Sequence, residues 1–230
     1  MEKTKILTEM FKEFGSNAQA ALDFISNPAN RRKLDVDLPV ISTTRRSSEP
    51  ETLIALEGSR YVTKEQWNSG RYPRKEAVGV AVCTPLVSFI VSQHQWEACW
   101  SKDTDHVITK KHTEAQAIQV ASGLEATKQI VDAQQSEDET AAKICWNYGF
   151  KNLQWYLPSL LELGIMCAYK KEINELMALI GGTSLEFDLF YWSSTEYSQY
   201  YSWHVYFDSG SFGGYGKYYG NVVRAVAAFS

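Results

Sequence analysis

The chain has 230 residues, of which 44% are apolar and 22% charged, as in a globular protein with one sizeable domain, alone or with an appendage. Its formal net charge of −4 argues against a nucleic-acid-binding protein that works through bulk electrostatics. No apolar run reaches the length of a membrane span, and the opening MEKTKILTEMFKEF lacks the apolar core of a signal peptide. We therefore expect neither nucleic-acid binding nor membrane insertion.

Residues 1–50 read as an N-terminal helical segment and linker. Apolar residues recur at steps of three and four, which predicts two short helices broken near Gly15. A polar stretch with three prolines follows and is typical of a linker or an extended arm. Because two short helices bury little surface by themselves, we expect this segment either to dock on the rest of the chain or to mediate self-association into a homo-oligomer.

Residues 51–230 separate strands from helices along the chain. The runs AVGVAVC and LVSFIVSQ flank Thr84 and Pro85 and predict a β-hairpin. Helical spacing follows, and short strands are expected after Phe190. The predicted helices cover residues 113–134 with Thr113 as N-cap, 137–148 before Gly149, a segment behind Pro158, and 170–180 before Gly181. Because element types are segregated, the sequence predicts an α+β domain rather than an alternating parallel sheet.

The stretch YYSWHVYFDSGSFGGYGKYYGN, residues 200–221, is rich in Tyr, Gly and Ser. Trp203, Val205 and Phe207 alternate with His204, Tyr206 and Asp208, which predicts a strand with one packed face and one exposed face. The next residues, 211–221, hold too many glycines for a regular strand. We expect them to form a loop whose glycines adopt backbone angles closed to other residues, before VVRAVAAF returns to the sheet interior.

This composition is typical of antibody binding loops, where tyrosine supplies large contact area and small residues supply adaptability. Eight of the thirteen tyrosines lie between Tyr191 and Tyr219. A cluster of rings without aliphatic partners makes a poor core, so we interpret the stretch as a binding surface. The alternative interpretation is an aromatic-rich hairpin with a purely structural role.

Several short motifs in the sequence resemble those of a known protein family. They are WYLPSLLEL at 155–163, the Gly181–Gly182 break, YWSSTE at 191–196, the alternating WHVYFD and the final VVRAVAAF. Together they resemble the variable proteins of diversity-generating retroelements, of the type found in gut bacteria and their phages. The resemblance covers residues 77–230 and implies a C-type lectin fold, with helices packed on short, mostly antiparallel sheets, which we extend to a ligand-binding domain over 51–230.

The resemblance also implies a function. In that family an error-prone reverse transcriptase rewrites adenines, and AAC codons become Tyr, His, Asp, Ser, Gly or Phe. A variable region over residues 191–229 is therefore implied, with Trp203 a buried scaffold residue and Gln199 and Lys217 outside the AAC-derived set. The implied ligand-binding residues are Tyr200, Tyr201, His204, Tyr206, Asp208, Phe212, Gly213, Gly214, Tyr215, Gly216, Tyr218, Tyr219, Gly220 and Asn221. The implied partner is a protein or glycan on a target surface that differs between variants.

Motifs for metal binding or catalysis are weak. The calcium-dependent lectins use Glu-Pro-Asn, Gln-Pro-Asp and Trp-Asn-Asp triplets, and this chain offers only EPE at 49–51. The four cysteines, Cys83, Cys99, Cys145 and Cys167, lie far apart and read as small buried hydrophobes. The histidines show no metal-ligand spacing. We therefore expect no enzyme activity, no metal and no cofactor.

The SSTE word, Ser193 to Glu196, suits backbone hydrogen bonding better than catalysis, because no second carboxylate stands at a motif distance. Two alternatives stay open for the function. One is a fixed-specificity structural or virion subunit whose aromatic stretch packs against a neighbouring copy; the other is a calcium-independent carbohydrate-binding lectin domain. A phage particle, the bacterial cytoplasm and the bacterial surface are all compatible locations.

Overall fold

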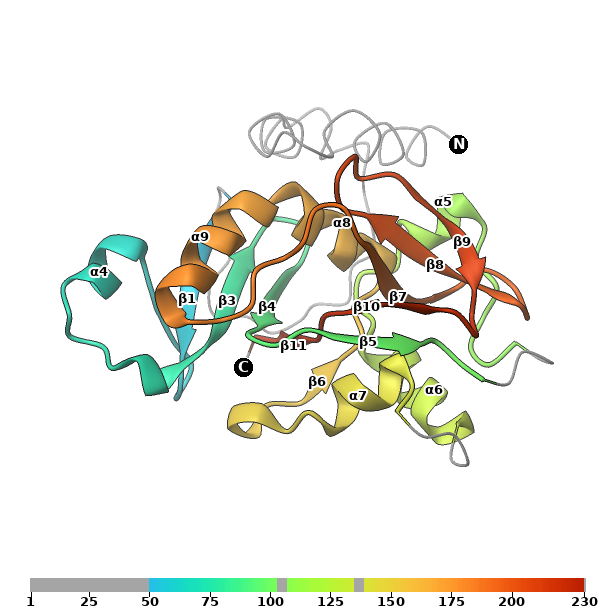
Figure 1. Cartoon of the computed structure of the whole chain (residues 1–230), viewed down its shortest axis with the longest axis horizontal. Helices are drawn as coiled ribbons and strands as arrows, with labels where there is room; N and C mark the ends of the chain where they lie inside the picture. The colour runs from blue at the N-terminus through green and yellow to red at the C-terminus, as the bar shows by residue number, and fades with distance from the viewer. Residues whose placement is uncertain (1–49, 103–106, 135–138, 230) are drawn as a thin grey trace.

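The computed structural model describes residues 50–102, 107–134 and 139–229 (Figure 1). The two predicted N-terminal helices and most of the predicted linker lie outside the described residues. The described part is an α+β fold built on two sheets, which confirms the predicted class.

The first sheet has six strands in the order β2-β1-β3-β4-β11-β6. Every neighbouring pair in it is antiparallel. Its strands are β1 (Glu51–Leu56), β2 (Arg60–Val62), β3 (Ala77–Cys83), β4 (Ser88–Ser92), β6 (Trp155–Tyr156) and β11 (Val226–Ala228). The predicted hairpin is β3 and β4, and Thr84 closes its turn, because its hydroxyl oxygen accepts a hydrogen bond from the Val87 backbone N–H at 3.1 Å.

The second sheet has five strands in the order β5-β10-β7-β8-β9. These strands are β5 (Trp96–Cys99), β7 (Phe190–Glu196), β8 (Tyr201–Tyr206), β9 (Phe212–Gly216) and β10 (Gly220–Val223). The short strands expected after Phe190 are confirmed. The expectation of an irregular loop over 211–221 was wrong, because β9 pairs with β8 from Tyr201 opposite Gly216 to Val205 opposite Phe212. Glycine can adopt extended backbone angles, and here the neighbouring strand β8 supplies the hydrogen bonds that hold β9 in the sheet.

Helices cover the strands from two sides, with α8 and α9 above them and α6 and α7 below them in Figure 1. The α-helices are α4 (Lys64–Asn68), α5 (Glu114–Ala117), α6 (Leu124–Ala133), α7 (Ala141–Asn147), α8 (Leu160–Ala168) and α9 (Lys170–Ile180). Two short 3-10 helices, η1 (Arg74–Glu76) and η2 (Phe150–Asn152), precede β3 and β6. The predicted helix behind Pro158 begins after a Ser159 cap, and α9 ends at Gly181 with φ of 75°.

The predicted helix over 113–134 was wrong in one respect, because the structure breaks it into α5 and α6. Thr113 does precede the first piece. The second piece begins after Gly123, whose N–H donates to the Glu162 carboxylate at 3.0 Å. A Cβ at Gly123 would lie 2.1 Å from the Leu157 carbonyl oxygen. Contacts with a segment more than thirty residues away therefore set the break.

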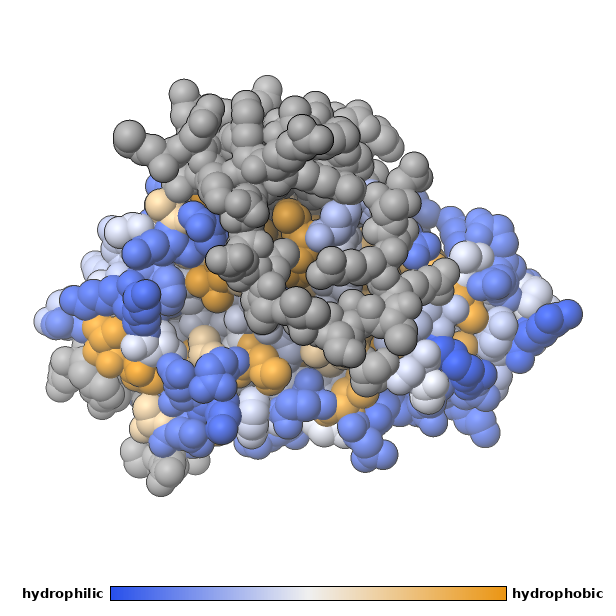
Figure 2. All heavy atoms as spheres, turned by 180° about the vertical axis from the view of Figure 1, so that it is seen from behind, coloured by the Kyte–Doolittle hydropathy of each residue, from blue (hydrophilic) through white to orange (hydrophobic). Residues whose placement is uncertain are grey.

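The core forms two clusters on opposite faces of the first sheet. One cluster joins Val80, Phe89 and Val91 to α8, α9 and the buried face of β8. The other joins Ala81 and Ile90 to residues of α6, α7 and β6. The C-terminal strands lie inside the sheets as predicted, β10 between β5 and β7 and β11 between β4 and β6. The face turned away in Figure 1 is mostly hydrophilic where it is described, with apolar residues in small separate areas (Figure 2).

Candidate ligand-binding surface

Strand β8 separates packed from exposed side chains as its alternation predicts. Trp203 and Val205 are buried, with Trp203 only 4% exposed. The Trp203 indole N–H donates to the His112 carbonyl oxygen at 3.2 Å. His204 and Tyr206 point to the other face and are half-buried. The predicted burial of Trp203 is therefore confirmed.

On that other face, aromatic rings from three strands and one turn stand side by side. The ring centroids of Tyr206 and Phe190 are 4.6 Å apart, and those of Phe190 and His204 are 4.7 Å apart. From His204 the contact continues to Tyr215 at 5.3 Å. Tyr219 follows at 5.2 Å from Tyr215, and Tyr218 at 4.0 Å from Tyr219. We call this set the aromatic row: Tyr206, Phe190, His204, Tyr215, Tyr219 and Tyr218.

The aromatic row is partly exposed and packs against a buried tryptophan on the same face of the sheet. Phe190 is 41% exposed, Tyr215 37%, Tyr219 46% and Tyr218 58%. On the same face, the fully buried Trp192 pairs with His204 across β7 and β8. Its ring centroid lies 6.1 Å from that of His204 and 5.9 Å from that of Tyr215. Phe190 was not among the predicted contact residues; pairing of Phe190 with Tyr206 across β7 and β8 brings it into the row.

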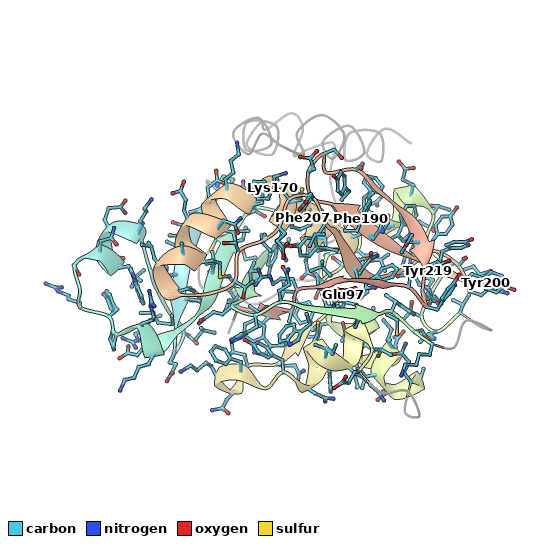
Figure 3. The ribbon with its side chains drawn as sticks, viewed as in Figure 1. Glu97, Lys170, Phe190, Tyr200, Phe207 and Tyr219 are labelled. Carbon is cyan, nitrogen blue, oxygen red and sulfur yellow. The ribbon has the colours of Figure 1, made fainter. Side chains whose placement is uncertain are left out.

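A second group of tyrosines stands at the turn between β7 and β8. Tyr197, Tyr200 and Tyr201 are all exposed. The Tyr197 ring packs edge-on against Trp203, with centroids 4.8 Å apart. Tyr200 and Tyr219 project from the same end of the second sheet (Figure 3). The predicted contact residues Tyr200 and Tyr201 therefore lie at one end of the aromatic row.

The other predicted contact residues are spread around the row. Asp208 is exposed in the turn between β8 and β9. The side-chain amide of Asn221 lies 3.4 Å from His204 Nδ1, which places it beside the row. Phe212 packs on the opposite face, 5.9 Å from Trp203 between centroids. The structure thus brings most of the predicted residues together and separates Phe212 from them.

The glycines of β9 do not have the role expected of them. Gly213, Gly214 and Gly216 are not among the residues with positive φ, so their backbone angles are open to other residues and that expectation was wrong. Their small size leaves room for rings instead. A Cβ at Gly214 would lie 2.9 Å from the Tyr197 ring, and one at Gly216 would lie 3.0 Å from the Tyr219 ring. A Cβ at Gly220 would lie 2.9 Å from a Glu97 carboxylate oxygen.

A buried ion pair lies next to one end of the row, because Lys217 directly precedes Tyr218. Lys217 and Glu196 pair with both side chains fully buried. The Glu196 carboxylate also accepts hydrogen bonds from the Ile108 backbone N–H at 3.1 Å and from the Thr109 backbone N–H at 2.7 Å. The Lys217 ammonium lies 4.7 Å from the Trp100 ring centroid. The predicted role of Glu196 as a hydrogen-bond acceptor is confirmed.

The serines of the SSTE word bond to backbone, as predicted. The Ser193 hydroxyl donates to the Trp203 carbonyl oxygen at 2.7 Å, and the Ser194 hydroxyl donates to the Pro158 carbonyl oxygen at 3.3 Å. Across the strands, the Ser202 hydroxyl donates to the Thr195 carbonyl oxygen at 2.8 Å. These serine hydroxyls therefore bind backbone carbonyl groups of neighbouring segments.

Burial keeps the histidine of the row uncharged. Loss of hydration lowers the pKa of His204 to about 4, so its imidazole is neutral at pH 7. The hydrogen bond with Tyr219 raises the pKa of the Tyr218 phenol. The aromatic row therefore offers rings, hydroxyl groups and a neutral imidazole rather than ionised groups.

A cavity of about 220 Å³ lies away from this surface, at the turn between β1 and β2. Leu56, Gly58, Tyr61, Lys151 and Leu153 are among its lining residues, and nothing in the sequence indicated it. In the described ranges no three His, Cys, Asp or Glu side chains gather where they could hold a metal ion. Nor does any helix there have the length and apolarity needed to cross a membrane. Cys83, Cys145 and Cys167 are buried, as predicted, whereas Cys99 is partly exposed.

No protein-family model matches the sequence, and no curated protein is significantly similar to it. Among solved structures, a fimbrial protein from Bacteroides ovatus is similar, with a TM-score of 0.60 and 13% sequence identity. The similarity covers 77% of this chain and 48% of that one, so this chain spans about half the length of the fimbrial protein. At that identity the similarity concerns the fold alone.

Proposed function

We propose that this protein is a non-enzymatic ligand-binding protein whose binding site is centred on the aromatic row, and that its scaffold is a C-type lectin fold of the kind diversified by retroelements. The observation that carries the proposal is the row itself: six rings in continuous contact, four of them more than a third exposed. Rings at such exposure contribute little to a core and much to an interface.

The division of roles within β8 supports the proposal. Trp203 and Val205 belong to the buried core, whereas His204 and Tyr206 belong to the row. Side chains of the row can therefore change without replacing the side chains packed on the opposite face of β8. This is the property that a hypervariable binding protein needs, because each variant must fold while its contacts differ.

The proposed ligand is a protein or glycan on a target surface. Tyrosine combines large contact area with a hydroxyl group and loses little conformational entropy on binding. A homo-oligomer of such chains would convert weak single-site contacts into avidity. Neither nucleic-acid binding nor membrane insertion belongs to the proposal.

Alanine substitution along the row tests it. The ligand is first identified by screening target-cell surface proteins. At least one of the variants Tyr215→Ala, Tyr218→Ala and Tyr219→Ala should then weaken binding by about 2 kcal/mol or more. The control is Leu124→Ala, which truncates an exposed side chain on α6 and should leave affinity unchanged. Binding should also persist in EDTA. Unchanged affinity in all three tyrosine variants would place the site elsewhere.

Genomic context tests the retroelement part of the proposal. A reverse transcriptase and a near-copy of the coding segment for residues 191–229, differing chiefly at adenines, should lie beside the gene. Among isolates, differences should concentrate at the exposed positions of that segment and spare Trp203. Differences spread evenly over the chain would contradict the proposal.

A fixed-specificity structural subunit is the second candidate, and the fold similarity to a fimbrial protein favours it. In that case the aromatic row would pack against a neighbouring copy and would be invariant among isolates. Light scattering of the wild type and of Tyr219→Ala separates the two candidates. Loss of an oligomer in the variant supports the subunit, whereas an unchanged mass with lost ligand binding supports the ligand-binding protein.

A further inference from the structure

Strand β9 ends its sheet in the part of the chain that the structure describes, because β8 is its one neighbour there. Residues Phe212 to Gly216 pair with β8 along one side without a register shift. The other side of the strand is an edge, and an edge strand presents backbone N–H and C=O groups that an extended chain can pair with. The aromatic row borders this edge through Tyr215.

The pairing pattern shows which groups point to the edge. The Tyr206 N–H donates to the Ser211 carbonyl oxygen at 2.8 Å, and the Lys217 N–H donates to the Tyr200 carbonyl oxygen at 3.0 Å. Hydrogen-bonded pairs alternate along an antiparallel ladder. Gly213 and Tyr215 therefore turn their backbone groups toward β8, and Gly214 turns both its N–H and its C=O toward the edge.

Gly216 has the same orientation as Gly214, but its carbonyl oxygen already accepts the Tyr219 N–H at 3.1 Å. Two donors and one acceptor of Gly214 and Gly216 thus remain directed at the edge, all of them beside exposed tyrosines. The sequence of β9, FGGYG, contains none of the proline or charged residues that usually protect an edge strand. The glycines also allow another backbone to approach closely.

We propose that the ligand of the aromatic row is an extended polypeptide segment that adds to the sheet beside β9. This inference rests on the proposed function and specifies the ligand class for the same site. Gly214 and Gly216 bind the backbone of the segment, independently of its sequence. Alternate side chains of the segment then meet Tyr215 and Tyr219 on one face of the sheet and Tyr197 on the other, and these contacts select the sequence.

The charges of this region narrow the chemistry of the segment. Within residues 190–221, Glu196 and Lys217 are buried together, and Asp208 carries the one exposed charge among the acidic and basic side chains. Asp208 lies in the turn that leads into β9. A segment without acidic residues at that end therefore fits best, because like charges repel.

The test uses the full chain and short, unconstrained peptides of random sequence, from which binders to the wild type are selected. Their affinity is then measured for Gly214→Pro and for the matched control Gly214→Ala. Both substitutions add a Cβ that meets the Tyr197 ring, and Gly214 is not among the glycines with positive φ. Only proline removes the N–H. We expect Gly214→Pro to bind about tenfold more weakly than Gly214→Ala.

Methylation of the peptide backbone gives a second measurement that does not depend on folding of a variant. Two peptide series carry methyl groups on alternate peptide nitrogens, one on the odd positions and the other on the even positions. Only one series should lose binding, because alternate N–H groups of an added strand point toward β9. Equal affinity of Gly214→Pro and Gly214→Ala, with both methylated series still bound, would overturn the strand addition. If no peptide is selected and the protein instead binds glycans, the proposed ligand class is wrong.

The same peptides separate failure of this inference from failure of the proposed function. If Tyr215→Ala loses binding while Gly214→Pro does not, the aromatic row is the site and strand addition is wrong. If neither Tyr215→Ala nor Tyr219→Ala changes the affinity, the proposed binding site itself is wrong.

Discussion

Replacing Lys217 by methionine should destabilise the protein more than any single change in the aromatic row. Methionine reaches as far as the lysine Cε and lacks the ammonium group, so the main change is the loss of the charge. Glu196 would stay fully buried with hydrogen bonds from Ile108 and Thr109 but without a cation.

The expected magnitude follows from that burial. Removing one member of a buried ion pair costs about 3–5 kcal/mol, because the remaining charge is left uncompensated in a poorly polarisable interior. The loss of the Trp100 contact adds to it in the same direction. A protein of this size has a free energy of unfolding of about 5–15 kcal/mol, so Lys217→Met should be folded but strongly destabilised.

Urea unfolding followed by tryptophan fluorescence measures the effect, and the variants Glu196→Gln and Glu196→Gln/Lys217→Met complete a double-mutant cycle. The double variant keeps an acceptor for Ile108 and Thr109 but has no buried charge. It should therefore be more stable than the sum of the two single changes predicts. A Lys217→Met variant within about 1 kcal/mol of the wild type, or an additive cycle, would refute this reasoning.

Two further predictions concern Trp203 and His204 of β8, with Tyr218 as a comparison. Trp203→Ala should lower the free energy of unfolding by about 3–5 kcal/mol, whereas Tyr218→Ala should change it by less than about 1 kcal/mol; thermal melts that show equal losses would mean that the row is core. Because burial lowers the pKa of His204 to about 4, the unfolded chain binds its proton at a higher pH than the folded chain does, and stability should fall as the pH drops from about 6.5 toward 4. His204→Phe should reduce that slope in unfolding measured across this range, and an unchanged slope would contradict the lowered pKa.

Local signals in the sequence predicted much of the fold. The β3–β4 hairpin, α8 and α9 each carry a turn, a cap or a glycine stop within the element itself. The alternation in β8 likewise depends on period two alone. These features require no knowledge of distant residues, so they can be read from a short window.

Features set by contacts between distant segments could not be read this way. The break before α6 depends on Leu157 and Glu162 meeting Gly123. Strand β9 has poor intrinsic preference for extended structure and is held by β8. In the candidate site, Phe190 was missed because it joins the row through pairing between β7 and β8. The burial of Lys217, in the turn between β9 and β10, could not be predicted either, since its partner is Glu196 at the end of β7.

The close spacing of rings in the aromatic row gives the protein an optical property. Tyr218 and Tyr219 have centroids 4.0 Å apart, and Tyr215 lies 5.9 Å from Trp192. Chromophores at such separations couple electronically and transfer excitation energy from tyrosine to tryptophan. A ligand that binds to the row and reorients these rings will change the near-ultraviolet circular dichroism and the emission of Trp192. Ligand binding can therefore be followed in solution without a label.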